Sequence, residues 1–253
     1  MYKFDAVKAK NDCIQWIRDW FEMNGNDCNA IIAISGGADS SIVAALCVEA
    51  LGKDRVFGIL MPDGEQKDIQ DAKDLVNHLG INYSILDIHD VVSSIIGMAA
   101  FSKSIFTGEL NITEQCKTNI APRIRMAIVR AISQNMNGRY INTCNFSENY
   151  IGFFTVDGDG TGDCSPLGNL TKTEVKEIGR LLLPPRFVDK PPADGLTGKT
   201  DEDNFGFTYD VLDKYIRTGE IEDMKIKAKI DAKHKANLFK LEPMAMFEYN
   251  KED

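Results

Sequence analysis

The chain has 253 residues, with 29 lysines and arginines against 38 aspartates and glutamates, which gives a formal charge of −9. This length suits one α/β domain, so we expect a single domain over residues 1–253. The acidic balance argues against a nucleic-acid partner, and the absence of a signal peptide and of a long apolar run indicates a cytoplasmic protein with no membrane contact.

Apolar periodicity predicts helices and strands that alternate along the first part of the chain. This alternation is typical of a doubly wound parallel sheet flanked by helices, a Rossmann-like α/β fold whose ligands bind beyond the C-terminal ends of the strands. The expected helices cover residues 6–23, 42–51, 66–79, 91–99 and 111–134, and the expected strands cover residues 30–34, 55–61, 81–86 and 139–143.

The later part of the chain reads as three helices and one long connection. A capping box, Thr171 with Glu174, predicts a helix that runs to residue 183. Residues 184–206 hold four prolines and three glycines, and we expect a lid that orders over bound ATP, with a passive linker as the alternative. Two further helices are expected over 209–217 and 221–236, and the lysines of the second are typical of a solvated face.

Residues 35–41, with the sequence Ser-Gly-Gly-Ala-Asp-Ser-Ser, lie between the first strand and its helix and predict a phosphate-binding loop. Free N–H groups at a helix start favour an anion, glycines allow close backbone approach, and Asp39 offers a carboxylate to a divalent cation. No Walker A triplet follows, and the alternative is a glycine-rich turn without a ligand. The candidate phosphate ligands are Ser35, Gly36, Gly37, Ala38, Asp39, Ser40 and Ser41.

Glu148 lies just beyond the fourth predicted strand, as Asp39 lies beyond the first. Two carboxylates at the same edge of a sheet can share Mg²⁺, although Glu148 can also be a helix-start carboxylate near the dipole. Lys172 is an unusual cation in the first turn of a helix, and a bound phosphate would explain it. The arginines of 111–134 are either a solvated basic face or ligands for an anionic substrate. Residues 152–163, rich in glycine and aspartate, do not match an EF-hand, and Phe153 with Phe154 indicates a wall for a flat ring.

The 35–41 loop resembles the pyrophosphate loop of the ATP pyrophosphatase superfamily, whose enzymes split ATP into AMP and pyrophosphate. Within that superfamily the order of motifs along nearly the whole chain resembles the NAD synthetases. The motifs that carry this resemblance are residues 35–40, 66–68 with Asp71, 119–126, Glu148, 152–155, 158–160, 166–167, 170–172, 193–194 and 234–235.

The resemblance implies a homodimer of adenine-nucleotide-hydrolase-like α/β domains with deamido-NAD held near the subunit interface. It also implies that ATP contacts residues 35–41, Thr143 and Lys172, and that Asp39 and Glu148 hold Mg²⁺. The residues implied for deamido-NAD are Arg125, Asp159, Asp163, His234 and Lys235, with Asp159 near the reacting nicotinate; Asp39, Lys172 and Asp159 are the implied catalytic residues.

This sequence departs from the family pattern at three positions. Leu60 stands where the family often has arginine, Val156 where it usually has lysine, and Pro192 where it usually has threonine. Two lost cations and a lost hydroxyl alter the expected nucleotide contacts. They leave the expected metal site and pyrophosphate loop untouched.

The implied reaction amidates deamido-NAD to NAD. The nicotinate oxygen attacks the α-phosphate of ATP to form an acyl-adenylate, pyrophosphate leaves, and ammonia then displaces AMP; the loop, Lys172 and Mg²⁺ stabilise the leaving charge. Asp159 is a hypothetical base for the ammonium. The roughly 30 residues before the first predicted strand have no room for a glutaminase domain, so free ammonia, or ammonia from a separate partner, is expected.

Two other functions compete with this interpretation. One is another ATP pyrophosphatase, such as the synthetase half of a GMP synthetase or a tRNA-modifying enzyme; the latter would be expected to show a basic surface or a catalytic cysteine pair. The other is a regulatory module that holds ATP without turnover. A second substrate loop and the paired carboxylates Asp39 and Glu148 argue against such a module.

Overall fold

A four-stranded parallel sheet lies at the centre of the chain. The computed structural model describes residues 2–66, 68–190, 200–247 and 249. The strands run in the order β3-β2-β1-β4, and every pairing is parallel, so the predicted doubly wound sheet is confirmed. The strands are β1 (Asn29–Ala33), β2 (Val56–Leu60), β3 (Asn82–Ile85) and β4 (Gly138–Tyr140).

Helices cover both faces of this sheet because successive strand residues point to opposite sides. Ala30 and Ile32 of β1 pack into one hydrophobic cluster, whereas Ile31 packs into a second. The first cluster also takes residues from α1 (Ala6–Gly25), α2 (Ala38–Leu51), α3 (Ile69–Leu79), α7 (Lys172–Arg180) and α8 (Pro185–Val188), and the second from α4 (His89–Thr107) and α5 (Glu114–Asn135).

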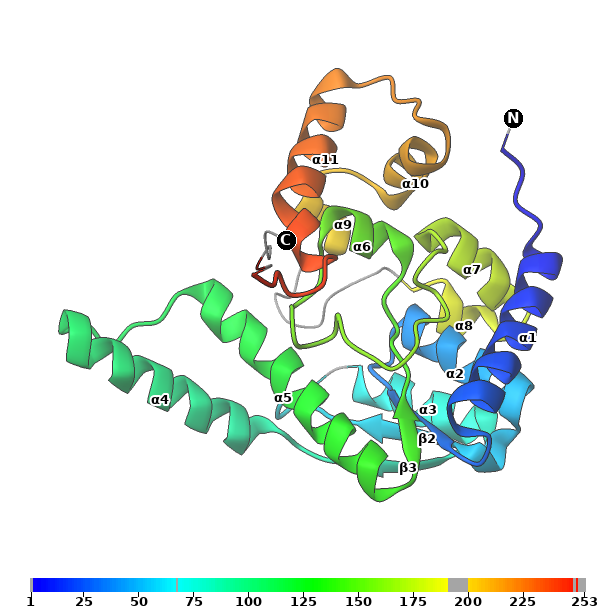
Figure 1. The fold of residues 1–253 in the computed structure, drawn as a ribbon, viewed down its shortest axis with the longest axis horizontal. Helices are drawn as coiled ribbons and strands as arrows, with labels where there is room; N and C mark the ends of the chain where they lie inside the picture. Colours follow the sequence, from blue (N-terminus) through cyan, green and yellow to red (C-terminus); the bar gives the residue numbers. More distant parts are fainter. Residues whose placement is uncertain (1, 67, 191–199, 248, 250–253) are drawn as a thin grey trace.

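Helix α4 extends away from the sheet together with the first half of α5, as Figure 1 shows. It is longer than the helix predicted over 91–99, and Val92 is the one buried residue among those described for it. A row of large apolar side chains on α4 and just beyond it is exposed. We call this row the α4 apolar stripe: Val91, Ile95, Met98, Phe101, Ile105, Phe106 and Leu110.

A third hydrophobic cluster joins helices that come late in the chain. Ile151, Phe205, Leu212 and Ile230 meet in it, each from a different helix. In Figure 1, α11 lies at the top with α10 beside it, and α6 and α9 lie between these helices and the sheet. The four helices are α6 (Phe146–Ile151), α9 (Asp201–Phe205), α10 (Tyr209–Thr218) and α11 (Met224–Asn237).

The long connection predicted over 184–206 differs from the structure at both ends. Residues 185–188 form α8 and residues 201–205 form α9, where a capping box between Thr200 and Asp203 starts the helix. Residues 191–199, which include Pro192, lie outside the described residues, so the lid stays a prediction. Single-domain organisation also stays a prediction.

Two further observations concern the whole described chain. All six cysteines carry free thiols; Cys28, Cys47 and Cys144 are buried, and the other three are half-buried. None of the helices in the described ranges has the length and apolar character that crossing a membrane requires.

Candidate active site

A cavity of about 600 Å³ opens beyond the C-terminal ends of β1 and β2, where a doubly wound sheet is expected to bind its ligands. The phosphate loop forms one wall of this cavity. Arg125 of α5, Asp159 of the glycine-rich loop and Lys172 of α7 are among its other lining residues. The sheet edge therefore brings together side chains from distant parts of the sequence.

The phosphate loop leads directly into α2, which begins at Ala38 rather than at residue 42 as predicted. Gly37 is the N-cap and no side chain of the described chain caps the helix. The first N–H groups of a helix have no partner within the helix, so this end can bind an anion. Gly36 has φ +85°, and a Cβ there would lie 2.6 Å from the Asp68 carbonyl oxygen, so this position requires glycine.

The serines of the loop divide into two groups. Ser35 and Ser40 line the cavity, and their hydroxyl oxygens lie 3.1 Å apart. Ser41 is buried behind the loop and does not line the cavity; its hydroxyl donates to the Gly37 carbonyl at 2.7 Å. Ser40 is buried as well, and its hydroxyl also donates to the Gly37 carbonyl, at 3.2 Å. Ser35 is exposed and is therefore the hydroxyl that can face a ligand, whereas Ser40 and Ser41 shape the turn.

Lys172 lies between the two predicted metal ligands. Its Nζ is 2.6 Å from Asp39 Oδ2 and 3.5 Å from Glu148 Oε1, and its side chain is only 6% exposed. Burial opposes the charge of this ammonium, but the two carboxylates outweigh burial and raise the pKa of Lys172. The carboxylates, rather than a phosphate, explain a lysine in the first turn of α7 in this structure.

Glu148 has a strongly shifted acidity. Its burial raises the pKa well above the ordinary value, with Lys172 opposing the shift and Asp39 adding to it. The carboxylate accepts a hydrogen bond from the Asn145 N–H at 3.2 Å, and the Glu148 N–H donates to Asn145 Oδ1 at 3.0 Å. This reciprocal capping box fixes Glu148 at the start of α6.

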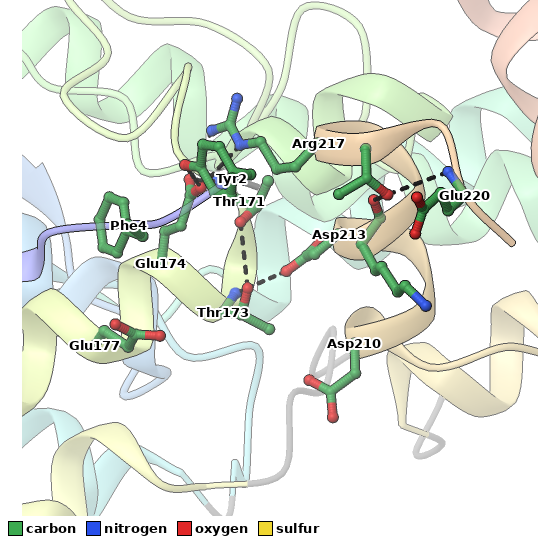
Figure 2. A pocket seen from close by; sticks show the side chains of 12 residues that line it. Tyr2, Phe4, Thr171, Thr173, Glu174, Glu177, Asp210, Asp213, Arg217 and Glu220 are labelled. Atoms are coloured by element: carbon green, nitrogen blue, oxygen red, sulfur yellow. Dashed lines mark hydrogen bonds and ion pairs between the residues drawn. The ribbon is translucent and has the colours of Figure 1, made fainter.

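The first turn of α7 is held by a set of polar contacts, and Figure 2 shows those of Thr173 with Asp213 and of Arg217 with Glu174 beside a second cavity of about 680 Å³. The Lys172 N–H donates to Ser147 Oγ at 2.9 Å, and the Thr173 N–H donates to Asp213 Oδ2 at 2.8 Å. Asp213 also accepts the Ser147 hydroxyl. Arg217 donates to both oxygens of Glu174, at 2.8 and 2.6 Å. These contacts fix the backbone that carries Lys172.

Asp39 and Glu148 fit a hard divalent cation. Asp39 Oδ1 is buried and has no hydrogen-bond partner among the described residues, so one carboxylate oxygen is left free to bind a cation. Magnesium is commonly held by one or two carboxylates together with water and substrate phosphates. No three histidine, cysteine, aspartate or glutamate side chains gather into a metal cluster within the described ranges, so phosphate or water would complete the coordination.

The cavity also holds Arg125 and Asp159, two of the residues predicted to contact deamido-NAD. Arg125 Nε donates to the Met61 carbonyl at 3.0 Å, and burial lowers the pKa of its guanidinium against the opposing effect of Asp63. Asp159 accepts the Thr155 N–H at 2.8 Å and remains accessible. The surrounding protein nevertheless desolvates this carboxylate enough to raise its pKa, which suits a group that accepts a proton. Thr143 also lines the cavity.

Three residues predicted to contact deamido-NAD lie outside this cavity. Asp163 pairs with Arg130 and accepts the Tyr140 N–H at 2.8 Å. His234 stacks on Tyr150 with ring centroids 4.0 Å apart, and Lys235 is exposed on α11. Their role in binding deamido-NAD stays a prediction.

The structure describes two of the three residues that depart from the family pattern, Leu60 and Val156. Leu60 is fully buried in the first hydrophobic cluster, so the side chain contributes packing where the family often has a cation. The Val156 carbonyl accepts a hydrogen bond from Arg123 Nε at 3.2 Å. This bond connects the loop at Val156 to α5.

The sequence did not reveal several residues of the site. Asn145 Nδ2 donates to Asp39 Oδ2 at 3.3 Å, and Tyr209 Oη lies 3.5 Å from Glu148 Oε1 and 2.9 Å from Asp201 Oδ2. Lys190 lines the cavity beside the phosphate loop. The sequence indicates Asn145 as the helix cap before Glu148. No local pattern indicates Tyr209, Asp201 or Lys190 as residues of the site.

Comparison with known proteins gives a consistent result. The family model described as NAD synthase matches residues 9–250. An NH(3)-dependent NAD(+) synthetase of Finegoldia magna is 35% identical over 97% of this chain and 98% of its own length. Another, of Pyrococcus horikoshii, is 40% identical over 80% of this chain and 76% of its own length.

Solved structures with similar folds cover nearly the whole chain. An NMN synthetase of Francisella tularensis has a TM-score of 0.87 at 29% identity, covering 98% of this chain and all of that one. An NH3-dependent NAD synthetase of Campylobacter jejuni has a TM-score of 0.76 at 28% identity, covering 97% and 100%. The family match, the relatives and the cavity at the sheet edge lead to one conclusion: this chain belongs to the NAD synthase family.

Proposed function

We propose that this protein amidates deamido-NAD to NAD with ATP and ammonia, through an acyl-adenylate, and that the cavity at the sheet edge is the site of both steps. The observation that carries the proposal is the Asp39–Lys172–Glu148 cluster at the open end of α2, in a chain of the NAD synthase family. A module that only held ATP would need neither the buried cation nor the second group of residues around Asp159.

In the first step the nicotinate carboxylate oxygen bonds to the α-phosphorus, the bond from that phosphorus to the bridging oxygen breaks, and pyrophosphate takes the electron pair. The N–H groups at the start of α2 and the Lys172 ammonium offer positive charge to the leaving oxygens. Because Lys172 is fixed by Ser147 and by its two carboxylates, little reorganisation is needed as the charge develops.

In the second step ammonia bonds to the acyl carbon, and AMP leaves with the electrons of the acyl–oxygen bond. Ammonium must lose one proton before this attack and the adduct must lose another. Asp159 is accessible from the cavity and has a raised pKa, so we assign it the role of proton acceptor. The charge of Asp159 acts on the pKa of Arg125, so the two side chains are near each other. We assign Arg125 the role of binding the anionic substrate.

Asp39 and Glu148 would hold Mg²⁺, with the free Asp39 oxygen as the first ligand. The ion, when bound, would neutralise phosphate charge. Removing it with a chelator is expected to abolish formation of both AMP and NAD, and addition of Mg²⁺ is expected to restore both. Full activity in the presence of excess chelator would contradict this assignment.

We propose a homodimer formed through the α4 apolar stripe. Monomeric proteins rarely expose a contiguous apolar surface of this kind, and Phe101 and Ile105 are 64% and 66% exposed. A Phe101→Glu variant is expected to elute as a monomer at concentrations where the parent chain is dimeric, whereas Lys103→Glu on the same helix should not dissociate it. A monomeric parent chain would contradict the proposal.

A cytoplasmic location is proposed as well, because the six free thiols suit a reducing compartment. We propose no nucleic-acid partner, since the formal charge of −9 disfavours phosphate backbones.

A second candidate function is amidation of the mononucleotide, because an NMN synthetase is among the solved structures with the same fold over the full chain. It requires the same adenylation chemistry and differs only in the length of the acid substrate. The relatives at 35% to 40% identity favour the dinucleotide.

The test supplies purified protein with ATP, Mg²⁺ and ammonium together with either deamido-NAD or nicotinate mononucleotide, and follows AMP and the amide product. We expect NAD and AMP in equal amounts from deamido-NAD, and a lower kcat/KM for the mononucleotide. A higher kcat/KM for the mononucleotide would favour the second candidate, and ATP hydrolysis that ignores both acids would contradict both.

A further inference from the structure

The cavity contains a third cation that the predicted mechanism does not use. Among the described lining residues, the positively charged side chains are Arg125, Lys172 and Lys190. Lys172 is bound by Asp39 and Glu148, and Arg125 lies on the side of Asp159. Lys190 lies at the phosphate loop itself.

Two contacts fix the position of the Lys190 ammonium. Its Nζ donates to the Gly36 carbonyl oxygen at 3.0 Å and forms an ion pair with Asp71 in the first turn of α3. The side chain of Lys190 is 25% exposed and that of Asp71 is 42% exposed, so neither charge is deeply buried. The loop backbone packs tightly against α3 here, because a Cβ on Gly36 would approach the Asp68 carbonyl to 2.6 Å.

This geometry places a lysine beside the backbone that is built for an anion. The open end of α2 attracts phosphate oxygens to the same loop, and a lysine ammonium has three donors on a flexible stem. One donor can remain on the Gly36 carbonyl while another reaches a phosphate oxygen. A half-exposed ion pair such as Lys190–Asp71 contributes little free energy, so a multiply charged phosphate can compete with Asp71 for the amine.

We propose that Lys190 binds the pyrophosphate end of ATP and remains bound to the pyrophosphate that leaves, with Asp71 holding the amine in place when the loop is empty. The inference rests on the proposed function only for the identity of the anion. It predicts opposite consequences for the two members of the ion pair. Loss of Lys190 removes a phosphate ligand, whereas loss of the Asp71 charge removes a competitor.

The experiment measures binding of magnesium pyrophosphate to the full chain by calorimetry, and the KM for ATP in the amidation assay. Lys190→Met is expected to weaken pyrophosphate binding at least tenfold and to raise the KM for ATP similarly. Asp71→Asn is expected to leave pyrophosphate binding unchanged or to tighten it. Arg186→Met, which removes an exposed cation from neighbouring α8, controls for the loss of one positive charge and should change binding less than threefold.

Equal weakening of pyrophosphate binding in Lys190→Met and Asp71→Asn would overturn the proposal. It would show that the ion pair only connects the segment after α8 to α3. Unchanged binding in Lys190→Met, or no pyrophosphate binding by the parent chain, would also overturn it. Thermal unfolding of each variant separates loss of fold from loss of a ligand. Because the calorimetric measurement needs no acid substrate, a chain that binds pyrophosphate but amidates neither dinucleotide nor mononucleotide would refute the proposed function and leave this inference intact.

Discussion

Helices α2 and α7 both bring a charged residue to the same cavity from their first turn, but their N-termini are built in opposite ways. Gly37 begins α2 without a side-chain cap in the described structure. Thr171 and Glu174 close the start of α7 with a reciprocal capping box, and Ser147 and Asp213 take its next two N–H groups. One helix end is open and the other is saturated.

The difference separates two tasks. An open N-terminus keeps its N–H groups and its positive dipole for a ligand, at the cost of helix stability. A saturated N-terminus has no free donor, so Lys172 on α7 acts as a side chain on a rigid base rather than as part of an anion-binding helix end. If the proposed function holds, we expect α2 to supply donors to the phosphates and α7 to fix the position of Lys172.

The largest expected effect comes from removing the charge that α7 supplies. Lys172→Met should lower the amidation rate by about 10² to 10³, the range seen when one donor to a developing anion is removed. Initial rates at saturating ATP measure the change. Lys176→Met, which is on the same helix outside the cavity lining, should retain the parent rate, and an active Lys172→Met variant would show that α7 is not part of the chemistry.

Closing the open end of α2 should have a smaller effect of a different kind. Gly37→Asp supplies a carboxylate cap where the phosphate is expected, and Gly37 has φ −79°, which a residue with a side chain can adopt. We expect the KM for ATP to rise at least about tenfold because the new charge repels phosphate, while the melting temperature stays equal or rises. Unchanged ATP binding in this variant would mean that the end of α2 does not contact phosphate.

Opening the saturated end of α7 should affect stability in a pH-dependent way. Burial would raise the pKa of Glu174, but hydrogen bonds from Arg217, Tyr2 and the Thr171 N–H outweigh it and lower the pKa below its ordinary value. A lowered carboxyl pKa stabilises the fold at pH values above the unfolded pKa, and this contribution is lost as the pH falls through the folded value.

Glu174→Gln should therefore reduce the free energy of unfolding by about 2 kcal/mol at neutral pH, the scale of hydrogen bonds to a charged group. The difference from the parent chain should shrink below about pH 4, where the parent carboxyl is also protonated. Urea unfolding at several pH values measures it. A constant difference across pH would show that the loss is one of packing and not of charge.

The features of this fold that depend on residues close together in the sequence were predictable from the sequence alone. The alternation of helices and strands, the Thr171–Glu174 capping box and the phosphate loop were all visible in short windows, and the structure confirms the first two and the strand–loop–helix arrangement of the third. The start of α2 was placed four residues late because small residues such as Ala38 and Ser40 do not show apolar periodicity.

The contacts that join distant segments were not predictable in this way. Lys172 meets Asp39 across 133 positions, and Asp213 reaches Thr173 across 40, so no local pattern identifies either partner. Helix α4 is also longer than predicted, and its added length carries Phe101 and Ile105, which no described residue buries. Sequence periodicity locates an apolar face but not the surface that buries it.

The burial of the cysteines has a consequence for how this protein reacts with electrophiles. Burial raises the pKa of Cys13 to about 11 and of Cys164 to about 12, and raises those of Cys47 and Cys144 well above the ordinary value. The thiolate is the nucleophilic form, so these four sulfurs are nearly inert to alkylation while the fold is closed. Their rate of labelling by a maleimide therefore reports how often the molecule opens, and a ligand that stabilises the sheet edge will slow it.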